Sequence, residues 1–347
     1  MKYGEIEGIG KPISRVVLGA MVVSSEALER SFALLDAAAQ LGITTLDTAH
    51  VYAGGRHERG IGAWMCDRAN REQMVIISKG AHHDERRCRV TPEDIASDLA
   101  DSLERLQTEY IDLYLLHRDD PAVPVGPIVE ALNMHYRAGR IHAFGGSNWT
   151  HTRLMEANAY AAEHGLQPFR ASSPHFGLAE MVREPWAGCL SIAGSEHTGA
   201  RAWYRQSDMP VFAYSCLGGG LFSGRFSRET FPALRETLDP ACVAAYCHEV
   251  NFQRLERAQQ LAAEKHVHVA QIALAYVLNT PLNLYAVVGV SSAERLRELT
   301  RACEMMLTSE EMAWLNLGER PIRIESISLT DLTLNPTQKA TKHSLIE

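Results

Sequence analysis

The chain lacks several features that would place a protein in a membrane or outside the cell. No apolar run approaches the roughly 18 residues that a membrane span needs. The first residues, MKYGEIEGIG, have no apolar core of the kind found in secretion signals. Its 7 cysteines are odd in number and form no Cys-x-x-Cys pair, which argues against a disulfide framework. We therefore expect a cytoplasmic protein with no membrane partner.

Basic charge is also scarce. The chain has 34 Lys and Arg against 42 Asp and Glu, a net charge of −8, and it contains no basic block. A protein that grips a phosphate backbone needs an excess of positive charge on one face. We therefore expect no nucleic-acid partner.

Two families of binding motif are missing as well. No Gly-x-Gly-x-x-Gly follows the first predicted strand and no phosphate-binding P-loop occurs, which argues against a doubly wound dinucleotide-binding sheet. The 15 histidines make a metal-dependent barrel hydrolase an alternative. However, there is no His-x-His after the first strand and no His-Glu-x-x-His, and the His-Val-His at 266–268 lies between two helical segments. We expect no metal site.

Short apolar strands alternate with amphipathic helices along the whole chain. The predicted strands are 15–20, 43–47, 74–79, 111–117, 141–147, 169–173, 211–215 and 284–290. Apolar residues recur every three or four positions between them, as in SEALERSFALLDAAAQLG. Another segment, TPEDIASDLADSLERLQ, begins with Thr91 as N-cap and Pro92 in the first helical position.

This alternation predicts a single (β/α)₈ TIM barrel over residues 1–347, with a C-terminal tail from about 319 to 347. A doubly wound sheet is the alternative fold. Two connections are long, at 177–209 and 216–282, and we expect them to be lids or walls of a binding site.

Polar side chains stand at the ends of successive predicted strands. Asp47, Lys79 and His117 end three of them, and Tyr52 follows the first by five residues. In barrels of this kind, reactive groups gather at the C-terminal ends of the strands. A phenol is too weak an acid for catalysis at neutral pH unless a nearby cation stabilises its anion. Lys79 is such a cation, a carboxylate keeps a buried Lys charged, and a His can donate a hydrogen bond to a carbonyl oxygen.

On these segments the sequence resembles the aldo-keto reductase family. The segments LDTAHVY, VIISKG and IDLYLLH match the family's catalytic signatures in order and spacing, and FGGSNW, FAYSCLGGGLFSGR and VVGVSSAERLREL match its cofactor segments. The resemblance covers roughly residues 10 to 315. It implies a barrel enzyme that interconverts a carbonyl and an alcohol with a nicotinamide dinucleotide.

The resemblance also implies roles for the four polar residues. Tyr52 is the expected general acid when a carbonyl is reduced and the base in the reverse direction. Lys79 is expected to lower the pKa of Tyr52, Asp47 to pair with Lys79, and His117 to orient the carbonyl.

Three further sets of residues match the family's cofactor positions. Ser147, Asn148 and Ser173 correspond to the side chains that hold the nicotinamide carboxamide, with Ser173 in place of the usual Gln, and Tyr214 to the aromatic that stacks on the nicotinamide. The pyrophosphate segment contains Ser215, Leu217 and Gly219, and the adenosine segment contains Gly289, Ser291, Arg295 and Glu298. Arg295 favours NADP(H), and NAD(H) stays open because Gly289 stands where many members have a Lys.

The resemblance implies a small carbonyl or alcohol as substrate. We expect Met21, His50 and Trp149 in its pocket, with Trp186 or Trp203 as a further wall. Polar neighbours in HRDD, at 117–120, favour a sugar-like carbohydrate substrate. A barrel that binds nicotinamide as a sensor or accessory subunit is the alternative to an enzyme.

Overall fold

The computed structural model describes residues 1–318 of the chain. The tail predicted at about 319–347 lies outside the described residues.

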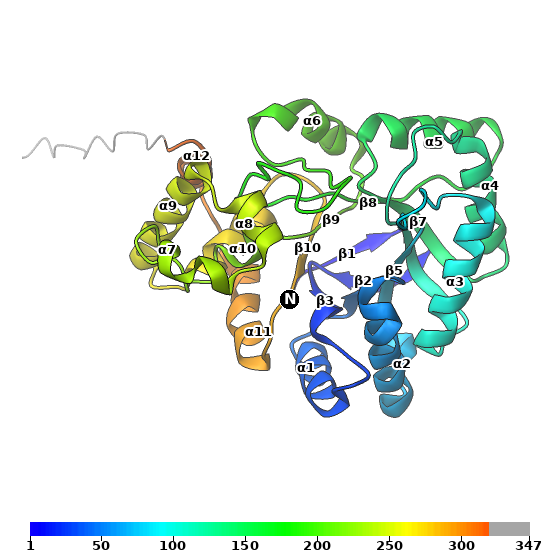
Figure 1. Ribbon diagram of the computed structural model, residues 1–347, viewed down its shortest axis with the longest axis horizontal. Coiled ribbons are helices and arrows are strands. Elements are labelled where there is room, and N and C mark those ends of the chain that lie inside the picture. Colours follow the sequence, from blue (N-terminus) through cyan, green and yellow to red (C-terminus); the bar gives the residue numbers. More distant parts are fainter. Residues whose placement is uncertain (319–347) are drawn as a thin grey trace, which may run out of the picture.

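Eight parallel strands form a closed barrel in the order β10-β3-β4-β5-β6-β7-β8-β9 (Figure 1). They are β3 (Val16–Gly19), β4 (Thr45–Asp47), β5 (Val75–Gly80), β6 (Ile111–Leu116), β7 (Ile141–Ser147), β8 (Ala171–Ser173), β9 (Val211–Ala213) and β10 (Leu284–Val288). Each lies within one residue of a predicted strand range. The prediction of a (β/α)₈ barrel is therefore confirmed.

Helices surround the strands (Figure 1). They are α1 (Leu28–Gln40), α2 (Arg56–Arg68), α3 (Pro92–Leu106), α4 (Val125–Arg137), α5 (His151–Glu163), α6 (Thr198–Ser207), α7 (Phe231–Leu234), α8 (Pro240–Tyr246), α9 (Glu249–Lys265), α10 (Val269–Asn279), α11 (Ala293–Thr300) and α12 (Ser309–Leu317). The first long connection contains α6, and the second contains α7 to α10, which gather with α12 at one side of the molecule in Figure 1. No helix among residues 1–318 is long and apolar enough to cross a membrane.

Local sequence explains where α3 begins. The Thr91 hydroxyl accepts a hydrogen bond from the Asp94 backbone N–H at 3.3 Å, and the Asp94 side chain accepts one from the Thr91 backbone N–H at 3.4 Å. This reciprocal capping box satisfies two N–H groups that the first helical turn would otherwise leave without partners. The predicted N-cap is confirmed.

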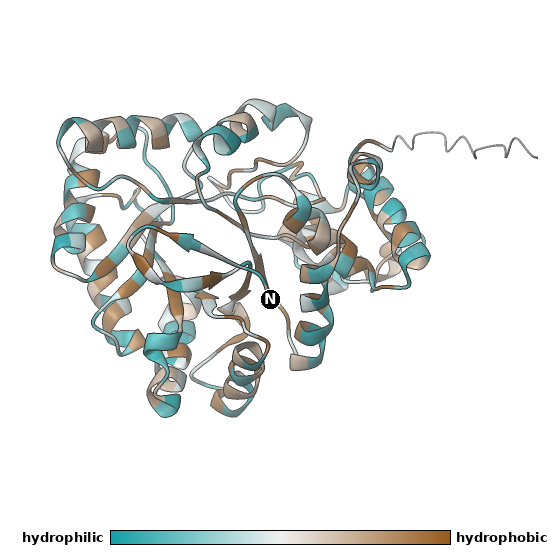
Figure 2. Ribbon diagram, turned by 180° about the vertical axis from the view of Figure 1, so that it is seen from behind, coloured by the Kyte–Doolittle hydropathy of each residue, from teal (hydrophilic) through white to brown (hydrophobic). Residues whose placement is uncertain are grey.

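The barrel has two apolar cores because successive residues of a strand face opposite sides of the sheet. In β5, Val75 and Ile77 belong to the interior core, whereas Ile76 belongs to the outer core between strands and helices. The strands are accordingly among the most hydrophobic segments in Figure 2. Burial on both faces explains why they appear in the sequence as continuous apolar runs rather than alternating ones.

A hairpin that the sequence analysis missed packs on the interior core. It consists of β1 (Tyr3–Ile6) and β2 (Ile9–Ser14) and turns at Gly8, whose φ is 95°. Ile6, Ile9 and Ile13 join the interior core. Because β2 leads directly into the start of β3, the hairpin lies at the N-terminal ends of the barrel strands. The opposite end, where the strands finish, is the one that holds the cavity described next.

Candidate active site

A cavity of about 500 Å³ opens at the C-terminal ends of the strands. Asp47, Tyr52, Lys79 and His117 all line it. Asp47 ends β4, Lys79 lies next to the end of β5, and His117 follows β6. The structure therefore brings together the four residues that the sequence singled out.

Lys79 and Asp47 form a buried ion pair. The distance between Lys79 Nζ and Asp47 Oδ1 is 2.7 Å, and Nζ also donates to the Thr48 carbonyl oxygen at 2.8 Å. Burial disfavours the charged form of Lys79, but Asp47 and Tyr52 outweigh it and raise its pKa above the usual value. Burial also raises the pKa of Asp47, against the opposing effect of Lys79. A carboxylate and an ammonium in contact reduce each other's cost of burial.

Tyr52 is held over this pair by an unusual turn. The next three residues, Ala53, Gly54 and Gly55, all have positive φ, at 48°, 62° and 84°. A Cβ on Gly55 would lie 2.7 Å from the Arg105 side chain, so both the backbone angle and the space require glycine there. The turn places the Tyr52 ring with its centroid 5.2 Å from Lys79 Nζ.

The electrostatics of Tyr52 follow from burial and from this cation. Burial raises the pKa of its phenol, while the Lys79 charge acts in the opposite direction. A phenol with a neighbouring ammonium can transfer its proton more readily than one buried alone.

His117 completes the floor of the cavity. Its ring stands edge-on to Tyr52, with centroids 5.5 Å apart and planes at 79°. Burial, reinforced by the charges of Lys79 and Arg118, lowers the pKa of His117 well below its usual value. His117 is therefore a neutral imidazole at pH 7, able to donate one hydrogen bond and accept another.

Asn148 uses its whole amide in contacts with the protein. Nδ2 donates to the His117 carbonyl oxygen at 3.2 Å and to Ser147 Oγ at 3.1 Å. Oδ1 accepts from the Leu190 N–H at 2.9 Å and from Tyr214 Oη at 2.8 Å. An amide has two donors and two acceptor lone pairs, so these contacts leave none for a ligand. In this arrangement Asn148, which also lines the cavity, ties the long connection and Tyr214 to the end of β6, and its expected contact with the carboxamide stays a prediction.

The other residues expected at the nicotinamide line the same cavity. Ser147, Ser173 and Tyr214 are all in its wall. The Ser147 hydroxyl donates to the Ser173 carbonyl at 3.0 Å, and the Ser173 hydroxyl donates to the Phe212 carbonyl at 2.8 Å. Each hydroxyl oxygen keeps a lone pair that can accept a hydrogen bond from an amide NH₂.

The glycine-rich loop after β9 forms one side of the cavity. Ser215, Leu217 and Gly219 line it, as does Gly220. Gly220 has a φ of 106°, and no atom lies within 4 Å of the place where its Cβ would stand. The corresponding position at Gly289 is also open. Backbone amides bordered by such open space suit the close approach of a phosphate or sugar. The residues present therefore fit a dinucleotide.

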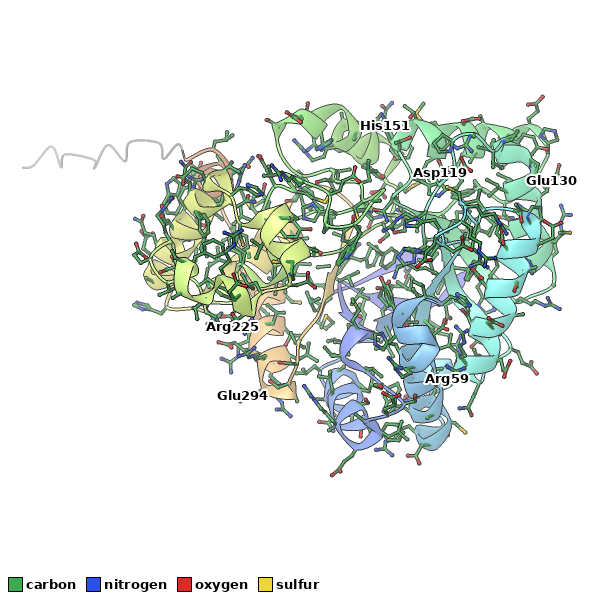
Figure 3. All side chains as sticks on the ribbon, viewed as in Figure 1. Arg59, Asp119, Glu130, His151, Arg225 and Glu294 are labelled. Carbon is green, nitrogen blue, oxygen red and sulfur yellow. The ribbon has the colours of Figure 1, made fainter. Side chains whose placement is uncertain are left out.

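The adenosine segment lies at the rim. Gly289 lines the cavity, while Ser291, Arg295 and Glu298 are exposed beyond it, at and within α11. Figure 3 shows Glu294, in the first turn of α11, at the edge of the molecule. The Arg30 side chain of α1 reaches the Ser291 carbonyl at 3.3 Å, so two arginines, Arg30 and Arg295, flank this segment.

The structure separates the three residues expected in the substrate pocket. Met21 lines the cavity and is 60 % exposed. His50 does not line it, because its ring turns to α3 and bonds the Asp101 carboxylate at 3.0 Å. Trp149 is fully buried behind the strands and donates to the Arg118 carbonyl at 3.2 Å. Placing His50 and Trp149 in the pocket was wrong.

The alternation of strand residues explains the error at His50. Asp47 faces the barrel interior, and backbone pairing with β5 continues through Thr48 and His50, whose N–H groups donate to Ile77 and Lys79. Residues three apart on such a segment face opposite sides. Counting from Asp47 would have placed His50 on the outer side.

Several other residues line the cavity and received no role from the sequence, among them His82 and Cys189. Of the two tryptophans considered for the wall, Trp186 is there, whereas Trp203 packs against Tyr204 and His151. His82 follows Lys79 by three residues, and its position just past a strand end is a signal that would have found it.

The acids after β6 do not reach the cavity. Asp119 pairs with Arg153 of α5 at 3.1 Å. Within residues 1–318 there is also no group of three or more His, Cys, Asp or Glu side chains placed to hold a metal ion.

Comparison with known proteins points to one family. A sequence model of the Aldo/keto reductase family matches residues 15–316. The uncharacterized oxidoreductase YrpG of Bacillus subtilis is 27 % identical over 91 % of this chain and 95 % of its own length. Norsolorinic acid reductase B of Aspergillus parasiticus is 29 % identical over 82 % of this chain and 73 % of its own. The crystal structure of a thermostable aldo-keto reductase with the inhibitor epalrestat superposes with a TM-score of 0.69, at 26 % identity, over 91 % of this chain and 99 % of that one.

Proposed function

The chain belongs to the aldo/keto reductase family, and on that premise we propose that it uses NAD(P)(H) with Tyr52 as general acid and base. Membership makes it an oxidoreductase of carbonyl and alcohol groups. The observation that carries the proposal is the buried 2.7 Å contact between Lys79 and Asp47, because it holds a cation 5.2 Å from the centre of the Tyr52 ring.

The proton transfer is assigned to Tyr52. In reduction, its hydroxyl donates a proton to the carbonyl oxygen as that oxygen gains negative charge, and in oxidation the phenolate takes the proton back. Burial alone would make the phenol too weak an acid, and the Lys79 charge counteracts this. Asp47 keeps Lys79 charged and holds its direction.

His117 is assigned to substrate orientation. Its low pKa makes it neutral, so one ring N–H is available to donate to the carbonyl oxygen without competing with Tyr52 for the proton. Its ring is edge-on to Tyr52, so one oxygen atom can receive hydrogen bonds from both.

In this proposal, the dinucleotide is held by the cavity wall that contains Ser147, Ser173, Tyr214 and the glycine-rich loop. Bound NAD(P)H supplies the hydride. Ser147 and Ser173 accept hydrogen bonds from the carboxamide, Tyr214 packs on the nicotinamide face, and the backbone of the glycine-rich loop meets the pyrophosphate. Asn148 acts indirectly: its Oδ1 accepts a hydrogen bond from the Tyr214 hydroxyl at 2.8 Å and so holds the Tyr214 ring in place.

Preference for NADP(H) over NAD(H) is assigned to the rim. Arg295 and Ser291 are exposed there, and Gly289 leaves the adenosine side open. Arg295 is the side chain we expect to face a 2′-phosphate, with Glu298 farther along α11 at the adenine end.

The cavity walls favour an apolar or aromatic substrate over a sugar. Met21, Trp186, Leu217 and Val287 line the cavity. Two polar groups that pointed to a carbohydrate are engaged elsewhere, His50 with Asp101 and Asp119 with Arg153. Arg118 lines the cavity, but its guanidinium donates to the carbonyl oxygens of Ala187 and His117. We propose an aldehyde or ketone carried on an aromatic ring.

We further propose that the enzyme is cytoplasmic and acts as a single barrel domain. All seven cysteines are unpaired, as in a reducing compartment. A sensor or accessory barrel that binds the dinucleotide without turnover is the second candidate, and the same assay separates the two.

The test is NADPH and NADH consumption with a panel of aromatic aldehydes, followed at the nicotinamide absorbance. Tyr52→Phe is expected to lower kcat by about 10²-fold or more, the usual contribution of a general acid. Tyr160→Phe is the matched control, because the Tyr160 hydroxyl donates to Glu130 on the outer helices and does not line the cavity. Near-wild-type turnover by Tyr52→Phe contradicts the role of Tyr52, and dinucleotide binding without turnover by the wild type favours the sensor.

A further inference from the structure

His82 lines the cavity but has no part in the proposed chemistry. It lies on the loop after β5, three residues beyond Lys79, and is half-buried. Its ring stands nearly perpendicular to that of His117, with centroids 4.8 Å apart. A second imidazole is therefore next to the group that orients the carbonyl.

The hydrogen bonding of His82 settles which nitrogen carries the proton. Nδ1 lies 2.8 Å from the backbone carbonyl oxygen of His83. A carbonyl can only accept, so Nδ1 is the donor. Burial lowers the pKa of His82 and the charge of Arg118 adds to this, so the ring is neutral at pH 7. In a neutral ring with hydrogen on Nδ1, the other nitrogen is a bare acceptor.

That acceptor is free. Within residues 1–318 no group donates a hydrogen bond to His82 Nε2, and the atom is not sealed in the interior. His82 borders the main cavity, whereas His83 borders the neighbouring groove and not the cavity. Nε2 is thus an uncommitted acceptor on a residue that lines the cavity and whose ring contacts that of His117.

The charges around it limit what it can receive. Lys79 and Arg118 both line the cavity, and Asp47, the one carboxylate that residues 1–318 contribute to its wall, is paired with Lys79. An ammonium group would meet two cations and no free anion. A neutral hydroxyl meets no such repulsion.

We propose that His82 Nε2 accepts a hydrogen bond from a hydroxyl group on the substrate, so that the enzyme selects hydroxyaryl aldehydes or ketones over their ethers. This rests on the proposed function, because it concerns the substrate of the same site. The aromatic ring packs against the walls formed by Met21, Trp186 and Leu217, and the phenolic O–H adds direction. A site built to bond a hydroxyl discriminates against an analogue that lacks the O–H.

The experiment compares 2-, 3- and 4-hydroxybenzaldehyde with the corresponding methoxybenzaldehydes. Each pair has a similar ring and differs in the O–H. The wild type is expected to show a hydroxy-to-methoxy ratio of kcat/KM of about 10 for at least one isomer, the value of a net hydrogen bond. His82→Phe is expected to reduce that ratio to about 1, and His82→Gln, whose side-chain oxygen can accept, to restore part of it.

His83→Phe is the matched control. It retains the backbone carbonyl that bonds His82 Nδ1 and changes a side chain outside the cavity, so its ratio should equal that of the wild type. A ratio near 1 for all three isomers in the wild type, or an unchanged ratio in His82→Phe, overturns the proposal.

Binding measurements separate this inference from the proposed function. The affinity of the best hydroxybenzaldehyde and of the corresponding methoxybenzaldehyde for the protein with NADP⁺, measured by calorimetry, needs no turnover, because NADP⁺ has no hydride to give to an aldehyde. If no aldehyde is reduced, the enzymatic proposal fails, while a hydroxyl preference that disappears in His82→Phe still supports the contact. If the hydroxy and methoxy compounds bind with equal affinity to the wild type and also to His82→Phe, the contact with His82 is refuted, even if aldehydes are reduced.

Discussion

Replacing Lys79 by Met tests the electrostatic account of Tyr52 most directly. Methionine is similar in length to lysine and carries no charge. Lys79 Nζ lies 5.2 Å from the Tyr52 ring centroid. Two unit charges at about this distance interact by about 3 kcal/mol at an effective dielectric constant of ~20. Since 1.4 kcal/mol is a factor of ten, the loss of the cation is expected to lower kcat for reduction on the order of 10²-fold.

The direction of the pH change follows from the same contact. Lys79 lowers the pKa of Tyr52, so its removal raises that pKa further. Alcohol oxidation needs the phenolate, and its rate should therefore begin to rise at a higher pH in Lys79→Met than in the wild type. The assay is the pH profile of kcat for oxidation of a benzyl alcohol with saturating NADP⁺. Lys79→Arg, which keeps a cation, should keep an onset closer to that of the wild type.

Lys11→Met is the control for loss of a partly buried, ion-paired lysine without loss of the cation at Tyr52. Lys11 Nζ pairs with Asp112 at 2.8 Å, and Asp112 keeps a second partner in Arg71 at 2.9 Å. This variant should lose some stability in urea denaturation and keep the pH profile of the wild type. An onset of alcohol oxidation in Lys79→Met at the same pH as in the wild type would refute the reasoning, whatever happens to kcat.

Three further perturbations test other contacts. Burial lowers the pKa of His175 to about 3, so its contribution to stability is full above about pH 6.5 and is lost as the pH falls toward 3. His175→Asn should therefore show a smaller decline of unfolding free energy between pH 6 and 4, by up to about 1.4 kcal/mol per pH unit, and equal slopes in urea titrations would contradict the assignment. Gly219→Ala should lower stability and NADPH affinity more than Gly165→Ala. Both glycines have φ near 60°, but of the two only Gly219 would place a Cβ 2.6 Å from Cys242 Sγ. Equal shifts in thermal unfolding would mean that only the backbone angle matters. Arg295→Ala should weaken NADPH by about 1 kcal/mol or more while leaving NADH nearly unchanged, and equal losses in fluorescence titrations would remove its 2′-phosphate role.

Most strands and the start of α3 could be predicted from the sequence, because the patterns that indicate them are local. Strands buried on both faces appear as short apolar runs, and Thr91 as N-cap and Pro92 as first helical residue indicate where α3 begins. The β1–β2 hairpin was missed because its alternation is weak and is broken by Pro12 and three glycines. The hairpin packs its isoleucines on the interior core at the N-terminal end of the barrel, and a contact of this kind between distant segments leaves no local pattern in the sequence.

The candidate site divides in the same way. Asp47, Lys79 and His117 stand at strand ends, and parallel strands bring their ends to one edge, so the sequence determined that these side chains would meet. The direction of a side chain beyond a strand end depends on what packs there. His50 turned to an acid on α3, and Trp149 turned into the core behind Asn148, whose φ is 61°.

The sequence by itself determined the barrel through its periodicity and the meeting of Asp47, Lys79 and His117 through their positions at strand ends. Its resemblance to a known family indicated the family and the role of Tyr52 beside them. Only the tertiary structure decided how the remaining polar groups are used. The amide of Asn148 is consumed by partners as distant in sequence as Tyr214, and His82 keeps a free acceptor because its own neighbour takes the other nitrogen. Hydrogen-bond capacity is finite, and which partner uses it is settled by distances in the folded chain.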